Sequence, residues 1–175
     1  MSEPKQTEAV LSLGGNLGDV PGTFRQAIRK LESGGLASIR ISSLFTTPPE
    51  GCGPGTPDFI NAAAAGLWGG TLEELHALCK NIEVAAGRPE EHVRFDSRTL
   101  DIDIIFFGDL LYSDQKLCIP HKEAAKRLFV LIPVAELAGD WIFPGGGTTV
   151  NEILAQSRGT KEFTLISATR CTLPE

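Results

Sequence analysis

Apolar and polar residues follow two periods along the chain, and these predict an alternating series of strands and helices. Short apolar runs bounded by glycine or by a change of pattern predict strands, whereas apolar residues spaced three or four apart predict helices. Strands are predicted at residues 10–13, 39–45, 59–68, 99–107, 141–143 and 163–166. Helices are predicted from Pro21 to Gly34, from 72 to about 87, and around 123–131 and 150–156. Gly108 and Asp109 predict a hairpin turn that leads into residues 110–112.

The order of these elements, with a hairpin among them, favours an α+β fold. We expect a ferredoxin-like α/β sandwich with a mainly antiparallel sheet and added strands, and a doubly wound sheet is the alternative. No internal repeat or linker interrupts the pattern. Residues 1–175 are therefore expected to form a single domain, in which residues 1–8 are a flexible N-terminus.

The composition limits the classes of function. The 175 residues are 42% hydrophobic and 22% charged, which is typical of a globular domain with a continuous core. The net charge of −6 argues against a general nucleic-acid binder, because such proteins usually carry a basic surface. No apolar run is long enough to cross a bilayer, and the first ten residues lack the pattern of a secretion signal. We expect a cytoplasmic monomer without nucleic-acid or membrane partners.

Asp101 and Asp103 are the clearest candidates for metal ligands, because the cysteines and histidines are scattered and suggest no zinc site. On an extended strand successive side chains point to opposite faces, so the two aspartates share one face. Their α-carbons are expected roughly 6.5 Å apart, so both carboxylates can reach one metal ion or hold two ions side by side. Hard oxygen ligands favour magnesium. The opposite face is predicted to hold Leu100, Ile102, Ile104 and Phe106, and the aspartate face to continue with Ile105 and Phe107.

Basic residues flank the aspartate pair on both sides in the sequence. Arg88, Arg94 and Arg98 precede it, and Lys116, His121, Lys122, Lys126 and Arg127 follow it. Magnesium and arginine together suit a polyphosphate, because metal ions bridge phosphate oxygens and guanidinium groups neutralise charge in the transition state. The alternative is an exposed edge strand with solvated acids, whose neighbouring cations balance surface carboxylates. Residues 14–19 match neither of the usual glycine-rich phosphate loops, so we interpret them as a structural turn.

Six segments follow the order of motifs in a known family. They are LSLGGNLGD at 11–19, SSLFTTPP at 42–49, DFINAA at 58–63, RTLDIDI at 98–104, IPH at 119–121 and RLFVL at 127–131. With these motifs the chain resembles 6-hydroxymethyl-7,8-dihydropterin pyrophosphokinase, a folate-pathway enzyme, over nearly its whole length. The resemblance implies that ATP donates a pyrophosphoryl group to the hydroxymethyl oxygen of the pterin and leaves AMP.

The resemblance also implies roles for individual residues. Two magnesium ions are expected at Asp101 and Asp103, and Arg88 and Arg98 are the candidates for catalytic charge neutralisation. The pterin is expected to contact Thr47, Pro48, Phe59, Asn61 and Phe129, with Asn61 at the hydrogen-bonding edge and the two phenylalanines stacked on the ring. ATP is expected to contact Lys80, Glu83, Arg98, Ile104, Lys116, His121 and Arg127.

The chain departs from the family pattern near the expected nucleotide. Phe95-Asp96-Ser97 stands where Trp-Gly-Pro is usual, and Glu90, Lys116 and Lys122 replace two arginines and an aromatic residue. The loops at 47–57 and 88–97 are expected to close over the substrates.

One rival hypothesis is a ferredoxin-like regulatory module that binds a purine or pterin without turnover. Another is an ATP-using transferase with a different acceptor.

Overall fold

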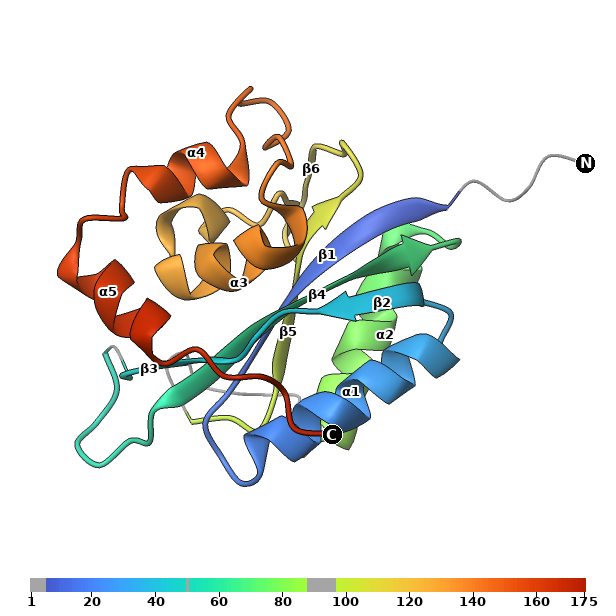
Figure 1. Cartoon of the computed structure of the whole chain (residues 1–175). Coiled ribbons are helices and arrows are strands. Elements are labelled where there is room, and N and C mark those ends of the chain that lie inside the picture. Colours follow the sequence, from blue (N-terminus) through green and yellow to red (C-terminus); the bar gives the residue numbers. More distant parts are fainter. Residues whose placement is uncertain (1–5, 50, 88–96) are drawn as a thin grey trace, which may run out of the picture.

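A five-stranded sheet forms the frame of the fold and has helices on both faces (Figure 1). The computed structural model describes residues 6–49, 51–87 and 97–175. Their strands are β1 (Thr7–Gly15), β2 (Ala37–Ile41), β3 (Phe45–Thr47), β4 (Phe59–Trp68), β5 (Asp101–Phe107), β6 (Tyr112–Ser113) and β7 (Cys118–Ile119). Their helices are α1 (Val20–Ser33), α2 (Leu72–Ala85), α3 (Leu128–Ala138), α4 (Val150–Ala155) and α5 (Lys161–Ala168), with a 3-10 helix at Ala124–Lys126. No helix in these ranges is long and apolar enough to span a membrane.

Helices α1 and α2 begin where the sequence supplies a cap. Asp19 accepts a hydrogen bond from the Gly22 N–H at 3.0 Å, and Pro21 occupies the first turn of α1. Thr71 and Glu74 form a reciprocal capping box at the start of α2. Both helices pack apolar side chains against the sheet, which confirms the predictions for these two segments.

The strands of the sheet are ordered β2-β4-β1-β5, and β3 also pairs with β4. All four pairings are antiparallel. This order confirms the predicted ferredoxin-like sandwich with a mainly antiparallel sheet, and it excludes the doubly wound alternative. Because β1 lies between β4 and β5 and runs opposite to both, the end of β1 lies beside the beginning of each neighbour.

Two apolar clusters pack on the two faces of the sheet. Helices α1 and α2 cover one cluster, which includes Leu11, Leu13 and Ile104 (Figure 1). Helices α3, α4 and α5 cover the other, which includes Val10 and Ala63. Alternate residues of a strand therefore belong to different clusters, as a period of two requires.

A bulge in β5 changes the predicted distribution of its side chains. Residues 10 and 11 of β1 pair with Phe106 and Ile104, so Ile105 is an extra residue in the register. Phe106 therefore joins Ile105 beneath α3, and Phe107 joins the cluster beneath α1 and α2. The expectation that Phe106 shares the face of Ile104 and that Phe107 shares the aspartate face is wrong, because one inserted residue reverses the alternation that follows it.

The predicted strand at 39–45 is divided into β2 and β3. Ser42 lies at the break, where its N–H donates to the Ala63 carbonyl at 2.9 Å and its Oγ accepts from the Ala63 N–H at 2.8 Å. Leu44 forms an isolated bridge with Cys171. The division escaped the prediction because a side chain here replaces a backbone partner without disturbing the apolar alternation.

The predicted last strand at 163–166 is wrong, because this segment belongs to helix α5. Thr160 caps the helix by accepting a hydrogen bond from the Phe163 N–H at 3.2 Å, and Ile166 is buried one turn later. A short apolar run is compatible with a strand or with a helix, and the N-cap at Thr160 is the feature that favours the helix. The predicted strand at 141–143 is reduced to one bridge between Ile142 and Thr149.

The helix predicted around 123–131 lies further along the chain. The 3-10 helix comes first, and α3 then continues through Pro133, which the prediction did not include. The apolar residues on either side of Pro133 are buried, and this packing outweighs the backbone hydrogen bond that proline cannot make.

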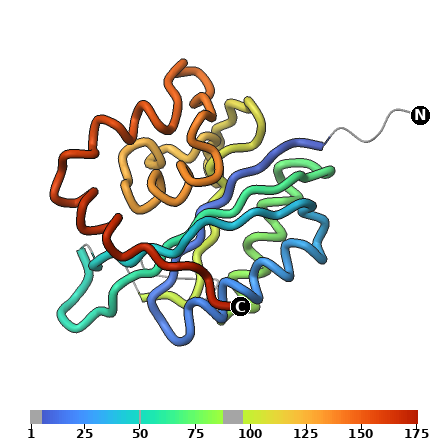
Figure 2. Tube along the Cα trace, in the orientation of Figure 1, coloured from blue at the N-terminus to red at the C-terminus, as the bar shows by residue number. Residues whose placement is uncertain are grey.

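Beyond α5 the chain crosses back toward α1 (Figure 2), where Arg25 Nη1 donates to the backbone oxygens of Pro174 and Glu175.

Two further boundaries differ from the predictions. Strand β1 begins at Thr7, which pairs with Trp68, so residues 7 and 8 belong to the sheet rather than to a flexible N-terminus. The turn at Gly108 does not lead into a strand that returns along β5. Tyr112 instead pairs with Ile119, so β6 and β7 form a separate hairpin.

Candidate active site

Polar side chains gather where β1 ends and β4 and β5 begin. Gly14 of β1 pairs with Asn61 on one side and with Asp101 on the other. One row further along, Ser12 pairs with Asp103. The strand alternation places these side chains on the face that α3 covers. The structure thus brings Asp101 and the predicted pterin-binding Asn61 to one row of one face, separated only by a glycine, and it places Asp103 two residues further along β5 on the same face.

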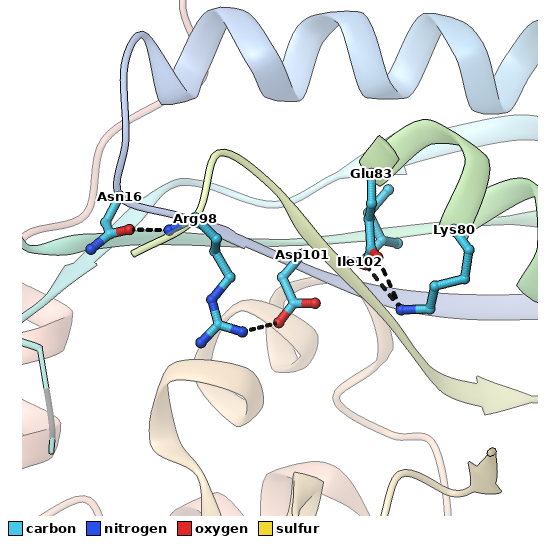
Figure 3. Close-up of polar contacts among 6 residues, drawn as sticks. All are labelled: Asn16, Lys80, Glu83, Arg98, Asp101 and Ile102. Carbon is cyan, nitrogen blue, oxygen red and sulfur yellow. Dashed lines mark hydrogen bonds and ion pairs between the residues drawn. The ribbon is translucent and has the colours of Figure 1, made fainter. Parts of the chain in front are cut away.

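The aspartate pair keeps the common face that the sequence predicted, because the bulge in β5 begins only after Ile104. Asp101 and Asp103 are half-buried, and Ile102 between them is buried on the opposite face. Arg98 Nη1 lies 3.0 Å from Asp101 Oδ2, in an ion pair whose side chains are 26% and 24% exposed (Figure 3). Both members therefore remain accessible to a ligand.

Arg98 has hydrogen-bonding capacity left for a ligand. Its guanidinium carbon lies 5.6 Å from the centre of the Phe59 ring, so the cation covers the predicted stacking residue. Its Nε atom is buried and has no hydrogen-bond partner in the described part of the chain, and the same holds for the Thr99 hydroxyl. Because an unsatisfied buried donor is costly, an anionic acceptor bound beside Arg98 would stabilise this arrangement.

The residues predicted for the pterin are assembled by the pairing of β3 with β4. Thr47 pairs with Phe59, and the Asn61 Nδ2 donates to the Thr47 Oγ1 at 3.0 Å, with both side chains buried. Pro48 is exposed directly after Thr47. Phe129 belongs to α3 on the same face of the sheet, partly buried against that cluster. The Asn61 amide thus lies across Gly14 from Asp101 and bonds to the Thr47 hydroxyl, the Phe59 ring lies against Arg98, and Phe129 packs on the same face of the sheet.

Glu83 and Lys80 lie on the other side of β5 (Figure 3). The Glu83 side chain is 3% exposed, and its Oε1 accepts a hydrogen bond from the Ile102 N–H at 2.6 Å. Lys80 Nζ lies 3.1 Å from both carboxylate oxygens. Glu83 thus fixes, by this hydrogen bond, the backbone of Ile102, the residue between the two aspartates. Nearby, burial and then the charge of Lys80 lower the pKa of His76, whereas the charge of Asp103 opposes this shift.

The other residues predicted for the nucleotide are spread around the edge strand β5. The His121 N–H donates to the Ile105 carbonyl at 3.2 Å, and exposed Lys116 lies in the turn between β6 and β7. Arg127 lies at the start of α3, with its guanidinium carbon 5.7 Å from the Phe129 ring centre. The Ile104 side chain is 2% exposed in the cluster beneath α1 and α2, so the structure does not bring it to the polar face.

Arg88 and the substituted residues Glu90, Phe95 and Asp96 lie outside the described residues. The described part of that segment begins at Ser97, whose Oγ accepts a hydrogen bond from Asn16. Sequence reasoning assigned residues 14–19 to a structural turn and so missed Asn16 and Gly14 as parts of the site. The available signal was a polar residue inside a glycine turn that directly follows a buried strand.

The fold and this row of side chains define a ferredoxin-like domain with polar side chains gathered where β1 ends and β4 and β5 begin. The sequence pattern of the 7,8-dihydro-6-hydroxymethylpterin-pyrophosphokinase family matches residues 10–139. The chain therefore belongs to this family, and the resemblance predicted from the sequence is confirmed.

Individual relatives differ in how much of their length the chain spans. The 2-amino-4-hydroxy-6-hydroxymethyldihydropteridine pyrophosphokinase of Methylorubrum extorquens is 37% identical over 151 residues, which cover 86% of this chain and 93% of that protein. The mitochondrial folate synthesis bifunctional protein of Arabidopsis thaliana is 39% identical over 132 residues, 75% of this chain but only 24% of that protein.

A solved structure agrees with the fold. The wild-type HPPK-DHPS of Plasmodium falciparum, solved with pteroate, superposes with a TM-score of 0.70 and 15% sequence identity. The match covers 97% of this chain and 46% of that one. At this identity the likeness concerns the fold alone, and it supports the ferredoxin-like assignment.

Proposed function

We propose that this chain transfers the pyrophosphoryl group of ATP to the hydroxymethyl oxygen of 6-hydroxymethyl-7,8-dihydropterin, as a step of folate biosynthesis. In this reaction the hydroxyl oxygen bonds to the β-phosphorus, the bond from that phosphorus to the α-phosphate oxygen breaks, and AMP leaves. The hydroxyl proton is released. The observation that carries the proposal is the row Asn61, Gly14 and Asp101, in which the amide proposed to bind the pterin lies across one glycine from a carboxylate proposed to hold magnesium.

The donor set suits magnesium, and we assign two ions to Asp101 and Asp103. Both ligands are carboxylates that share one face and remain partly accessible. Within the described ranges no group of three or more acidic, histidine or cysteine residues gathers. A site with only two carboxylates is compatible with magnesium, because this ion usually completes its coordination with water and substrate phosphate. When bound, magnesium supplies neutralisation of phosphate charge and a template for the phosphate oxygens.

The protein contributes positioning and charge rather than covalent chemistry. Arg98 would bind the transferred phosphates through its Nε, which has no hydrogen-bond partner among the described residues, and through the Nη1 that now pairs with Asp101. Arg88 is proposed for the same role from the family pattern. Asn61 would bind the edge of the pterin, and Phe59 and Phe129 would stack on its faces, with Thr47 and Pro48 beside them.

The nucleotide is proposed to lie along the outer edge of β5. Lys80, Lys116, His121 and Arg127 would supply the cationic contacts. Glu83 would act beside Lys80, and Ile104 would contribute through its backbone, since its side chain belongs to the core. This assignment needs no Walker loop, because side chains and metal hold the phosphates.

The decisive experiment incubates the purified protein with magnesium, ATP and 6-hydroxymethyl-7,8-dihydropterin. The expected products are AMP and the pterin diphosphate in equal amounts. Formation of ADP would identify a single-phosphoryl kinase, and binding of both substrates without turnover would identify the regulatory module. The proposal also includes a cytoplasmic monomer, which fractionation of cells and light scattering would test.

A further inference from the structure

Asn16 occupies a position from which it can reach both halves of the site. It follows the last residue of β1, the strand that lies between β4 and β5. Pro57 lies two residues before Phe59 at the start of β4, and Arg98 lies three residues before Asp101 at the start of β5. The antiparallel order brings these three points together, although they are far apart in the sequence.

The Asn16 side chain is buried, and both of its polar atoms are used. Its Oδ1 accepts a hydrogen bond from the Arg98 N–H at 2.8 Å (Figure 3). Its Nδ2 donates to the Pro57 carbonyl and to the Ser97 Oγ, both at 3.1 Å. The backbone adds a fourth bond, from the Asn16 N–H to the Arg98 carbonyl at 2.9 Å. One residue therefore holds the chain on both sides of the site.

These bonds require a side-chain amide in one orientation. Arg98 presents an N–H, which needs an acceptor, whereas Pro57 presents a carbonyl, which needs a donor. If the amide were turned around, donor would face donor and acceptor would face acceptor, so the network fixes the orientation. An aspartate would keep the acceptor for Arg98 but would place an oxygen against the Pro57 carbonyl. An alanine would remove both contacts.

We propose that Asn16 is a positioning residue that sets the separation between Arg98 and Phe59. These two side chains already contact each other, with 5.6 Å between the guanidinium carbon and the ring centre. Through Arg98 the amide fixes the phosphate side of the site, and through Pro57 it fixes the beginning of the strand that carries the pterin-binding residues. The inference rests on the proposed function for its kinetic consequence, and its structural part stands on the hydrogen bonds alone.

The kinetic test compares two substitutions of Asn16 with a control. Asn16→Ala is expected to lower kcat by about 100-fold, the cost of misplacing reacting groups by about 1 Å. Asn16→Asp keeps the bond to Arg98, so it is expected to retain most of kcat and to raise mainly the KM for the pterin. Asn81→Ala, at an exposed asparagine of α2, serves as the control and is expected to match the wild type. Equal kinetic constants for Asn16→Ala and Asn81→Ala would overturn the inference.

Amide hydrogen exchange supplies a readout that does not depend on activity. In Asn16→Ala the Arg98 amide is expected to exchange faster, while the Ile102 amide, bonded to Glu83, keeps its protection. Unchanged exchange at Arg98, or equal acceleration at both amides, would overturn the local role. If Asn16→Ala does not fold, Asn16→Asp carries the test, with Arg98 expected to stay protected. A wild-type protein without pyrophosphokinase activity would refute the proposed function, while exchange at Arg98 would still decide the role of Asn16.

Discussion

The two faces of the central sheet are built from the same strands but have different chemistry. Beneath α1 and α2 the face is apolar along its length, from Ile102 and Ile104 on β5 across to Leu11 and Leu13 on β1. Beneath α3 the face is apolar only over part of its length. Toward the beginning of β4 and β5 it becomes polar, with Asn61, Asp101 and Asp103 as its side chains.

This difference separates stability from activity at neighbouring positions of one strand. In β5 the residues alternate between a buried isoleucine and a half-buried aspartate up to Ile104. Substitution of an isoleucine removes packing, whereas substitution of an aspartate removes a charge at the polar end of the other face. Adjacent substitutions should therefore produce opposite phenotypes.

The largest expected effect is the loss of turnover in Asp101→Asn and Asp103→Asn. Each substitution keeps the shape of the side chain but removes a negative charge from the proposed magnesium site, so kcat should fall by about 1000-fold or more. Thermal unfolding should change little, because both side chains lie at the accessible end of the face. Removal of magnesium with a chelator should abolish turnover of the wild type. A variant that loses its fold instead would show that the aspartates are structural.

Ile102→Ala, at the residue between the two aspartates, should have the reverse effect. Its side chain is 1% exposed beneath α1 and α2, and its removal should lower the free energy of unfolding by about 2–5 kcal/mol. Urea denaturation measures this loss, and activity per folded molecule should stay near the wild-type value. A large loss of kcat in the fully folded variant would contradict the separation of the two faces.

The polar end of the face was largely predictable, because it depends on local pattern. The alternation around Asp101 predicted that the two aspartates share one face, and the pairing of β5 with β1 confirms this. The roles of these residues and of Asn61 stay predictions. The helices α1 and α2 were predictable for the same reason, since their caps and apolar stripes are local.

The contacts that hold this site together were not predictable from a single sequence. Asn16 binds residues 41 and 81 or more positions away, and Glu83 binds a backbone N–H on another element. The bulge at Ile105 depends on how β5 pairs with β1, and no residue type within β5 predicts it. Segment 163–166 is apolar but short, so its pattern is compatible with a strand, whereas in the structure it belongs to the helix that Thr160 caps.

Gly14 and Gly15 sharpen the comparison, because adjacent glycines of β1 face the two sides of the sheet. A β-carbon at Gly15 would lie 2.5 Å from the Thr99 carbonyl oxygen, so Gly15→Ala should destabilise the protein by about 1–3 kcal/mol. A β-carbon at Gly14 would lie 3.5 Å from Asn61 Oδ1, an ordinary contact. Gly14→Ala should therefore fold normally but raise the KM for the pterin roughly tenfold, because its methyl group enters the polar row. Equal unfolding temperatures for the two variants would contradict this distinction.

The smallest expected effect is on the chemical reactivity of Cys79, which lies on α2 in the apolar cluster. This reactivity reports how well the face beneath α1 and α2 excludes water. Burial raises the pKa of its thiol from the ordinary value of 9.0 to about 12, so the folded protein keeps the thiol protonated. Any stability from this shift is present below pH 9 and is lost as the pH rises toward 12, which leaves stability near neutral pH unaffected. At pH 8 iodoacetamide should label exposed Cys171 readily and Cys79 only after denaturation. Labelling of both at the same rate in the folded protein would mean that α2 opens from the sheet, and the apolar face would then be no more closed than the polar one.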